Sequence, residues 1–218
     1  MDTLFAKVPQ PVFSAGISGG VSFINPTDIN DQIQFNNSAF NTAEPPIRTP
    51  GQFAVWLGFR PPNLPSVLSI RGEMLRFSRV FSYTAKVTGP SSTTTSTFSD
   101  QATSRYSLYA FSINAGAVME KTRLKMEIGF IFALAVFDDE VSMGPYGKQE
   151  KSYNGQGNGF RIALQQIMPL SEKLGLSIDF GYRYLRLDEF RDNRGAFLKG
   201  MEANFSGVTL MMGLSYGF

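Results

Sequence analysis

The chemistry open to this chain is restricted first by two residue types that it lacks. Its 218 residues include no histidine and no cysteine. Without histidine there is no Ser-His-Asp triad, no imidazole general base and no imidazole metal ligand. Without cysteine there is no thiolate nucleophile, disulfide or thiolate zinc site. We therefore expect a protein that is not an enzyme and that has no catalytic residues, no metal site and no cofactor.

Three polar clusters could still do chemistry. The run Asp138-Asp139-Glu140 could act in general acid/base catalysis or bind calcium, and the mixed-charge segment 188–194 could hold a ligand. The glycine-rich segment 155–159 resembles a phosphate-binding loop, but no helix follows it whose N-terminus could receive an anion. We interpret all three segments as solvated loop.

The elements that would position side chains are strands, because the dominant pattern has a period of two. It is clearest at the end of the chain, where the residues between the apolar positions are mostly small. The apolar positions there are Val208, Leu210, Met212, Leu214, Tyr216 and Phe218. Residues 124–134 and 174–184 alternate in the same way. This pattern predicts strands with one bulky apolar face, each about long enough to cross a bilayer at a tilt.

Weaker versions of the pattern bring the expected strands to eight. These occupy 11–24, 52–60, 66–84, 104–119 and 158–170. Within 66–84 the apolar positions slip from Leu68, Ile70 and Met74 to Phe77, Phe81 and Tyr83. Either a β-bulge or a strand that continues beyond the membrane would produce this slip.

The connections between these strands alternate between long and short. The long ones are 25–51, 85–103, 138–157 and 188–202, and the short ones are 60–65, 120–121 and 171–173. We expect one domain over 1–218, with 1–10 as a periplasmic N-terminal segment and with four long loops outside the cell. Short periplasmic turns opposite longer outer loops are typical of outer-membrane barrels.

The facing of the side chains favours a membrane barrel over a soluble one. Phe, Tyr, Leu, Ile and Met on the apolar face are too bulky for the interior of an eight-stranded barrel, so they should point into lipid. A soluble β-sandwich is the alternative.

The sequence excludes a helical membrane protein, because its longest apolar run, 128–137, is about half of the roughly 20 residues that a membrane helix needs. A net charge of +2 without a dense basic cluster predicts no nucleic-acid partner.

Charged residues on the opposite face should meet inside the barrel at similar depth. They are Arg71, Glu73, Lys125, Glu127, Asp179 and Arg183. Paired, they would plug the bore; a gated pathway is the alternative. Further out, the inward positions become apolar, at Ile131, Ala133, Phe137, Leu185, Leu187 and Phe205. This outer half is either simple packing or a pocket open to the outside.

The chain resembles the small eight-stranded outer-membrane barrels of Gram-negative bacteria, of the OmpA/OmpX type and the related OmpW type. The whole architecture carries this resemblance, and its most specific element is the final strand that ends on the aromatic Phe218. The resemblance implies periplasmic termini, a bacterial outer-membrane location after removal of a signal peptide, and insertion by the barrel-assembly machinery, which recognises such a final strand.

We expect the barrel to be a membrane anchor whose outer loops serve adhesion or envelope assembly, with lipopolysaccharide, host molecules or envelope proteins as partners. The alternative is a narrow transporter for small hydrophobic solutes, which the resemblance to the OmpW type implies. Enzymes among the small barrels, such as the lipid A deacylases and omptin proteases, need a histidine, which this chain lacks.

Overall fold

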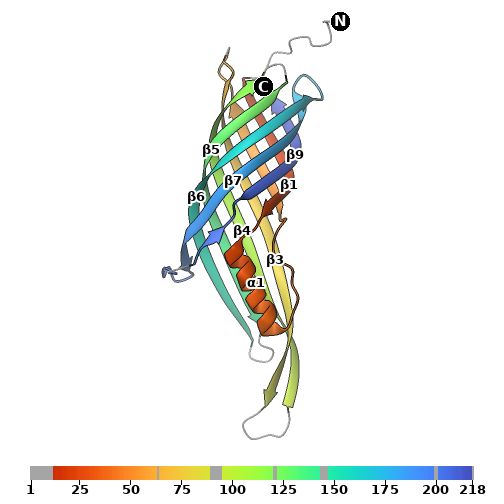
Figure 1. The fold of residues 1–218 in the computed structure, drawn as a ribbon, viewed down its shortest axis with the longest axis vertical. Helices are drawn as coiled ribbons and strands as arrows, with labels where there is room; N and C mark the ends of the chain where they lie inside the picture. Colours follow the sequence, from red (N-terminus) through yellow and green to blue (C-terminus); the bar gives the residue numbers. More distant parts are fainter. Residues whose placement is uncertain are drawn as a thin grey trace.

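A computed structural model describes residues 12–62, 64–88, 95–119, 122–142, 147–198 and 201–217 of the chain. They form one closed antiparallel sheet (Figure 1). Its ring consists of β1 (Phe13–Ile24), β2 (Gly51–Phe59), β3 (Ser66–Thr88), β4 (Thr95–Met119), β5 (Leu124–Ser142), β6 (Lys148–Pro169), β7 (Leu174–Asp192) and β9 (Gly207–Gly217). Each strand pairs with the next, and β9 closes the ring by pairing with β7 and β1. The predicted eight-stranded up-and-down barrel is confirmed.

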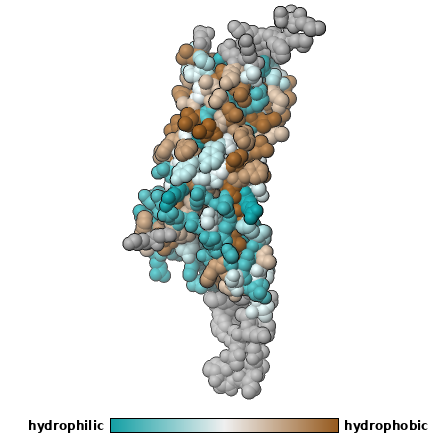
Figure 2. Space-filling model, in the orientation of Figure 1, coloured by the Kyte–Doolittle hydropathy of each residue, from teal (hydrophilic) through white to brown (hydrophobic). Residues whose placement is uncertain are grey.

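Bulky apolar side chains cover the outside of the barrel. On β5, Ile128, Phe130 and Phe132 are each about half exposed, whereas the alternate residues Glu127 and Ile131 are buried. Tyr109, Tyr182, Tyr184 and Tyr216 also point outward. On the face drawn in Figure 2, hydrophobic residues gather over one half of the molecule and hydrophilic residues over the other. The apolar face therefore meets lipid, and the chain is a transmembrane barrel of the outer-membrane type.

No helix in the described part of the chain is long and apolar enough to cross a membrane.

The long connections contain more regular structure than the sequence suggests. Residues 85–88 belong to β3 and 95–103 to β4, so most of the predicted loop 85–103 is strand. β5 and β6 likewise extend into 138–157, and β7 extends to Asp192. The loop boundaries predicted at 85, 138 and 188 are therefore wrong. Strands β3 to β7 continue beyond the ends of β1, β2 and β9 and form an extension at the end of the barrel away from Phe13 and Gly217, which we call the outer extension (Figure 1).

The slip of apolar positions in β3 marks this outer extension and not a bulge. The β3–β4 register runs without a shift from Ser66↔Ala117 to Thr88↔Thr95. Inward positions change along the strand from the charged Arg71 and Glu73 to the apolar Leu75 and Phe81, all of them buried. The apolar residues thus move from the lipid face to the interior because the strand leaves the membrane.

The glycine-rich segment 155–159 is also strand and not a flexible loop. It lies within β6, with Gly155 and Gly159 buried on the inward face. A Cβ added at Gly155 would overlap the ring of Phe190, and one at Gly159 would overlap the backbone of Tyr184. These glycines therefore make room for the interior packing and for the close approach of β7.

Helix α1 (Thr27–Phe40) occupies the first long connection, which the sequence pattern predicted as loop. Its buried residues Ile29 and Ile33 join the interior apolar cluster. Asn30 fixes the following segment: its Oδ1 accepts from the amide of Ile47 at 2.7 Å, and its Nδ2 donates to the carbonyl of Ile47. A short strand, β8 (Ala203–Asn204), pairs with β7 beside the helix. Both elements lie beside the outer extension, where the shorter strands β1 and β9 end (Figure 1).

The opposite end of the barrel carries the turn between β6 and β7 and the first and last residues of the described ring. Phe13 pairs with Phe59, and the amide of Gly217 donates to the carbonyl of Lys173 in the turn between β6 and β7. Three sequence predictions fall outside the described residues: the segment 1–10, the turn 120–121 and Phe218.

Candidate functional site

Inside the membrane-spanning part of the barrel, the six predicted charged side chains are buried and belong to two groups of one network. Arg71 Nε lies 2.6 Å from Glu73 Oε1, and Arg71 Nη1 lies 3.2 Å from Asp179 Oδ2. Arg183 Nη1 contacts Glu73 Oε2 at 3.0 Å. Lys125 Nζ contacts Glu127 Oε1 at 3.1 Å and lies 4.7 Å from the ring centre of Trp56. The alternation placed all six on the same face, and the fold brings their charged groups together.

A seventh charged residue, Arg161, was missed by the sequence analysis. Its Nη2 donates to both carboxylate oxygens of Asp179 at 2.7 Å, and its guanidinium lies 3.7 Å from Glu73 Oε1 and 3.8 Å from Glu127 Oε2. It therefore links the two halves of the network. Its position between Phe160 and Ile162, two outward residues, is the signal that could have identified it.

Above this network, the inward apolar residues form a packed core. The side chains named from the sequence are each at most 5% exposed: Ile131, Ala133, Phe137, Leu185, Leu187 and Phe205. They join Leu75, Leu108 and Phe190 in the cluster that also contains Ile29 and Ile33 of α1. Of the two alternatives, packing therefore describes most of this layer, because Phe137 alone among the six lines the cavity beneath α1.

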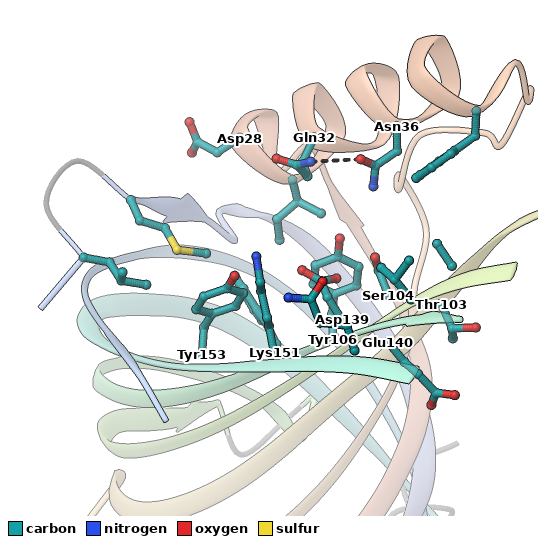
Figure 3. Close-up of a pocket in the computed structure, with 18 of the residues that line it drawn as sticks. Asp28, Gln32, Asn36, Thr103, Ser104, Tyr106, Asp139, Glu140, Lys151 and Tyr153 are labelled. Atoms are coloured by element: carbon teal, nitrogen blue, oxygen red, sulfur yellow. Dashed lines mark hydrogen bonds between the residues drawn. The ribbon is translucent and has the colours of Figure 1, made fainter. Parts of the chain in front are cut away.

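That cavity has a volume of about 680 Å³ and lies between α1 and the outer extension (Figure 3). Its floor is aromatic: Tyr106 and Phe137 meet edge to face with ring centres 5.1 Å apart. Ile29 and Phe40 of α1 and Leu198 and Met201 near β8 complete the apolar lining. The volume lies within the range of small-molecule sites, roughly 300–1,000 Å³.

Polar side chains enter the same cavity from opposite sides. Gln32 and Asn36 lie on α1, Asp139 and Lys151 lie on β5 and β6, and Asp28 lies at the rim at the start of α1 (Figure 3). Burial raises the pKa of the half-buried Asp139, and a hydrogen bond from Ser104 and the charge of Lys151 partly oppose the rise. Among the described residues, neither Asp139 nor Lys151 forms an ion pair within 4.0 Å.

Other charged side chains of the segments 138–140 and 188–194, which the sequence analysis considered for ligand binding, form hydrogen bonds or ion pairs with nearby residues. Asp138 accepts from Ser152 Oγ at 2.6 Å, and Glu140 lies 2.5 Å from Lys148 Nζ. Asp192 accepts from the backbone amides of Arg194 and Ala196. In the described part of the chain, no cluster of three or more acidic side chains is arranged to hold a metal ion.

Comparison with known proteins shows similarity at the level of fold. No family model and no curated protein sequence matches this chain. Among solved structures, the outer membrane protein OprG from Pseudomonas aeruginosa matches 98% of this chain and 99% of its own, with a TM-score of 0.50 and 10% identity.

Two further structures match with lower scores. Ail of Yersinia pestis, solved with the heparin analogue sucrose octasulfate, covers 94% of this chain and 99% of its own at a TM-score of 0.48 and 13% identity. Neisserial surface protein A covers 96% of this chain and 99% of its own at 0.47 and 11%. The chain thus has the fold of the small outer-membrane β-barrels, as its resemblance to that family implied.

Proposed function

We propose that this transmembrane barrel anchors an ordered outer surface in the bacterial outer membrane, with a bore closed to solutes. The outer extension and α1 would present that surface to lipopolysaccharide, to a host molecule or to another envelope protein. The proposal assigns no catalytic role to the chain.

The difference between the two ends of the barrel carries this proposal. At one end, β3 to β7 continue beyond the apolar band and, together with α1, build a largely hydrophilic extension (Figure 2). At the other end, the connections 60–65 and 171–173 are short. A passive anchor does not need an ordered extension at one end of the barrel. Binding residues are concentrated on the connecting segments that a rigid scaffold positions, and this extension is such a region.

The packing of the interior supports a closed bore. Arg71, Arg161 and Asp179 are at most 3% exposed, and the next layer outward contains Leu185, Leu187 and other buried apolar side chains. An ion crossing the barrel would have to displace both layers.

The final strand supports insertion by the barrel-assembly machinery, with the short turns and the chain ends in the periplasm. The outer face of β9 is accessible to an assembly factor. Four of its side chains are each about half exposed: Leu210, Met212, Leu214 and Tyr216. Periplasmic termini would direct α1 away from the cell.

Conductance tests the closed bore. In planar lipid bilayers, the purified protein should show little or no steady ion conductance, whereas Asp179→Ala should show brief small openings because it disrupts the buried network. Steady conductance by the parent protein, or faster uptake of a small hydrophobic solute into liposomes, would refute the closed bore and favour a transporter.

Orientation is testable because the chain contains no cysteine to give a background signal. Phe35 of α1 is 66% exposed, and Glu172 lies exposed in the short turn after β6. On intact cells, a membrane-impermeant maleimide should label Phe35→Cys and leave Glu172→Cys unlabelled until the outer membrane is opened. The opposite pattern would place the extension in the periplasm and contradict the proposal.

A further inference from the structure

The cavity under α1 has the properties of a small-molecule site that the anchor function does not require. It is bounded by three separate parts of the chain: helix α1, the outer ends of β4 to β6, and the segment around Met201. An apolar gap of this size would be filled by packing in an ordinary core, since protein interiors leave few voids larger than a water molecule. Here it is lined by apolar and charged groups together (Figure 3).

The charges that remain available inside the cavity are predominantly negative. Glu140 and Glu202 also line it, but Lys148 and Arg186 pair with them at the rim. That leaves the half-buried carboxylate of Asp139 and the exposed carboxylate of Asp28 at the rim against the ammonium group of Lys151. Lys151 is exposed on a flexible side chain and can swing into solvent, whereas Asp139 is half-buried and remains in place.

The aromatic floor adds to this preference. Tyr106, Phe137 and Tyr153 line the cavity next to Asp139. The faces of aromatic rings carry partial negative charge and attract organic cations, and they also accept apolar groups. A carboxylate beside several aromatic rings therefore suits a molecule that is both apolar and positively charged.

We propose that this cavity binds a small amphipathic organic cation, with its ammonium group near Asp139 and its apolar body on Tyr106 and Phe137. Lys151 competes with the ligand for Asp139 and moves aside when the ligand binds. The inference concerns the cavity alone and holds for either function of the barrel.

Three probes that differ mainly in charge test the proposal. Phenethylamine, 2-phenylethanol and 3-phenylpropionate are titrated by calorimetry into the full protein in nonionic detergent micelles, with empty micelles as the blank. The amine should bind more tightly than the alcohol, and the carboxylate most weakly. Chemical shifts of backbone amides in 103–106 and 151–153 should change with the amine.

Two substitutions should act in opposite directions. Asp139→Asn should weaken amine binding roughly fivefold, the scale of one partly exposed ion pair. Lys151→Gln should strengthen it, because it removes the competing ammonium group, and this exposed position leaves the fold intact. Neither substitution should change alcohol binding. Asp188→Asn, an exposed Asp on β7 outside the cavity, is the matched control and should leave amine affinity unchanged.

The proposal is overturned if the amine shows no saturable binding, if it binds no better than the alcohol, or if the carboxylate binds best. Weaker amine binding by Lys151→Gln would also overturn it, because Lys151 would then contribute to the site. These outcomes would leave the conductance and labelling results for the anchor untouched.

Discussion

Removal of the Asp179 carboxylate should be among the most damaging single changes to this barrel. Asp179 is 2% exposed and accepts from Arg161 Nη2 at 2.7 Å and from Arg71 Nη1 at 3.2 Å. The buried layer holds four cations, Arg71, Lys125, Arg161 and Arg183, against three carboxylates, Glu73, Glu127 and Asp179. Asp179→Ala therefore raises its net charge from +1 to +2, leaves Arg161 without its main partner and leaves Arg71 with Glu73 alone.

Breaking a buried ion pair from one side typically costs about 3–5 kcal/mol. We expect Asp179→Ala to lower the free energy of unfolding within this range, and the control Asp188→Ala, at an exposed position, by less than about 0.5 kcal/mol. The assay is urea unfolding in micelles, followed by fluorescence of Trp56, which is the only tryptophan and lies inside the barrel.

A second substitution separates charge imbalance from simple loss of packing. Asp179→Ala combined with Arg161→Leu restores the net charge of +1, so the double variant should lose less stability than the sum of the two single losses, by roughly 0.5–3 kcal/mol. Additive losses, or a loss below about 1 kcal/mol for Asp179→Ala alone, would refute the view that Asp179 holds the network together.

Three other outcomes are expected. Phe130→Arg, in the middle of the lipid-facing band of β5, should cost roughly 2–4 kcal/mol of folding free energy in vesicles, whereas Phe130→Leu should cost much less; equal costs would mean that this face does not meet lipid. Lys148→Gln should raise the pKa of Glu140, which the hydrogen bond and charge of Lys148 hold below its ordinary value, and carboxyl-carbon NMR titration would detect the change. In the parent protein the contact between Glu140 and Lys148 should weaken as the pH falls through the lowered pKa of Glu140. An unchanged pKa of Glu140 in the Lys148→Gln variant would show that this contact is not formed. Finally, the closed barrel should migrate differently on SDS gels before and after boiling, and identical migration would contradict a closed transmembrane barrel.

Alternation along the chain determined the barrel wall. A period of two assigns each residue to one face, and only the small and charged face, with residues such as Glu127 and Asp179, fits inside eight strands. The facing of Phe130 and the burial of Arg71 were therefore predictable from local sequence. The burial of Arg161 was equally predictable, because it alternates with the outward residues Phe160 and Ile162, although the sequence analysis missed it.

The outer part of the molecule was decided by tertiary contacts. Residues such as Asn154 and Gly157 favour turns locally, yet they lie in β6 because strands on both sides supply backbone partners and Phe190 fills the space left by Gly155. Helix α1 has a weak apolar stripe, Ile29, Ile33 and Phe40, which is stabilised by packing on the barrel core and by the hydrogen bonds of Asn30 to Ile47. The cavity that places Asp139, Lys151 and Tyr106 together exists only because this helix docks there, and sequence periodicity carries no information about contacts between residues so far apart in the chain.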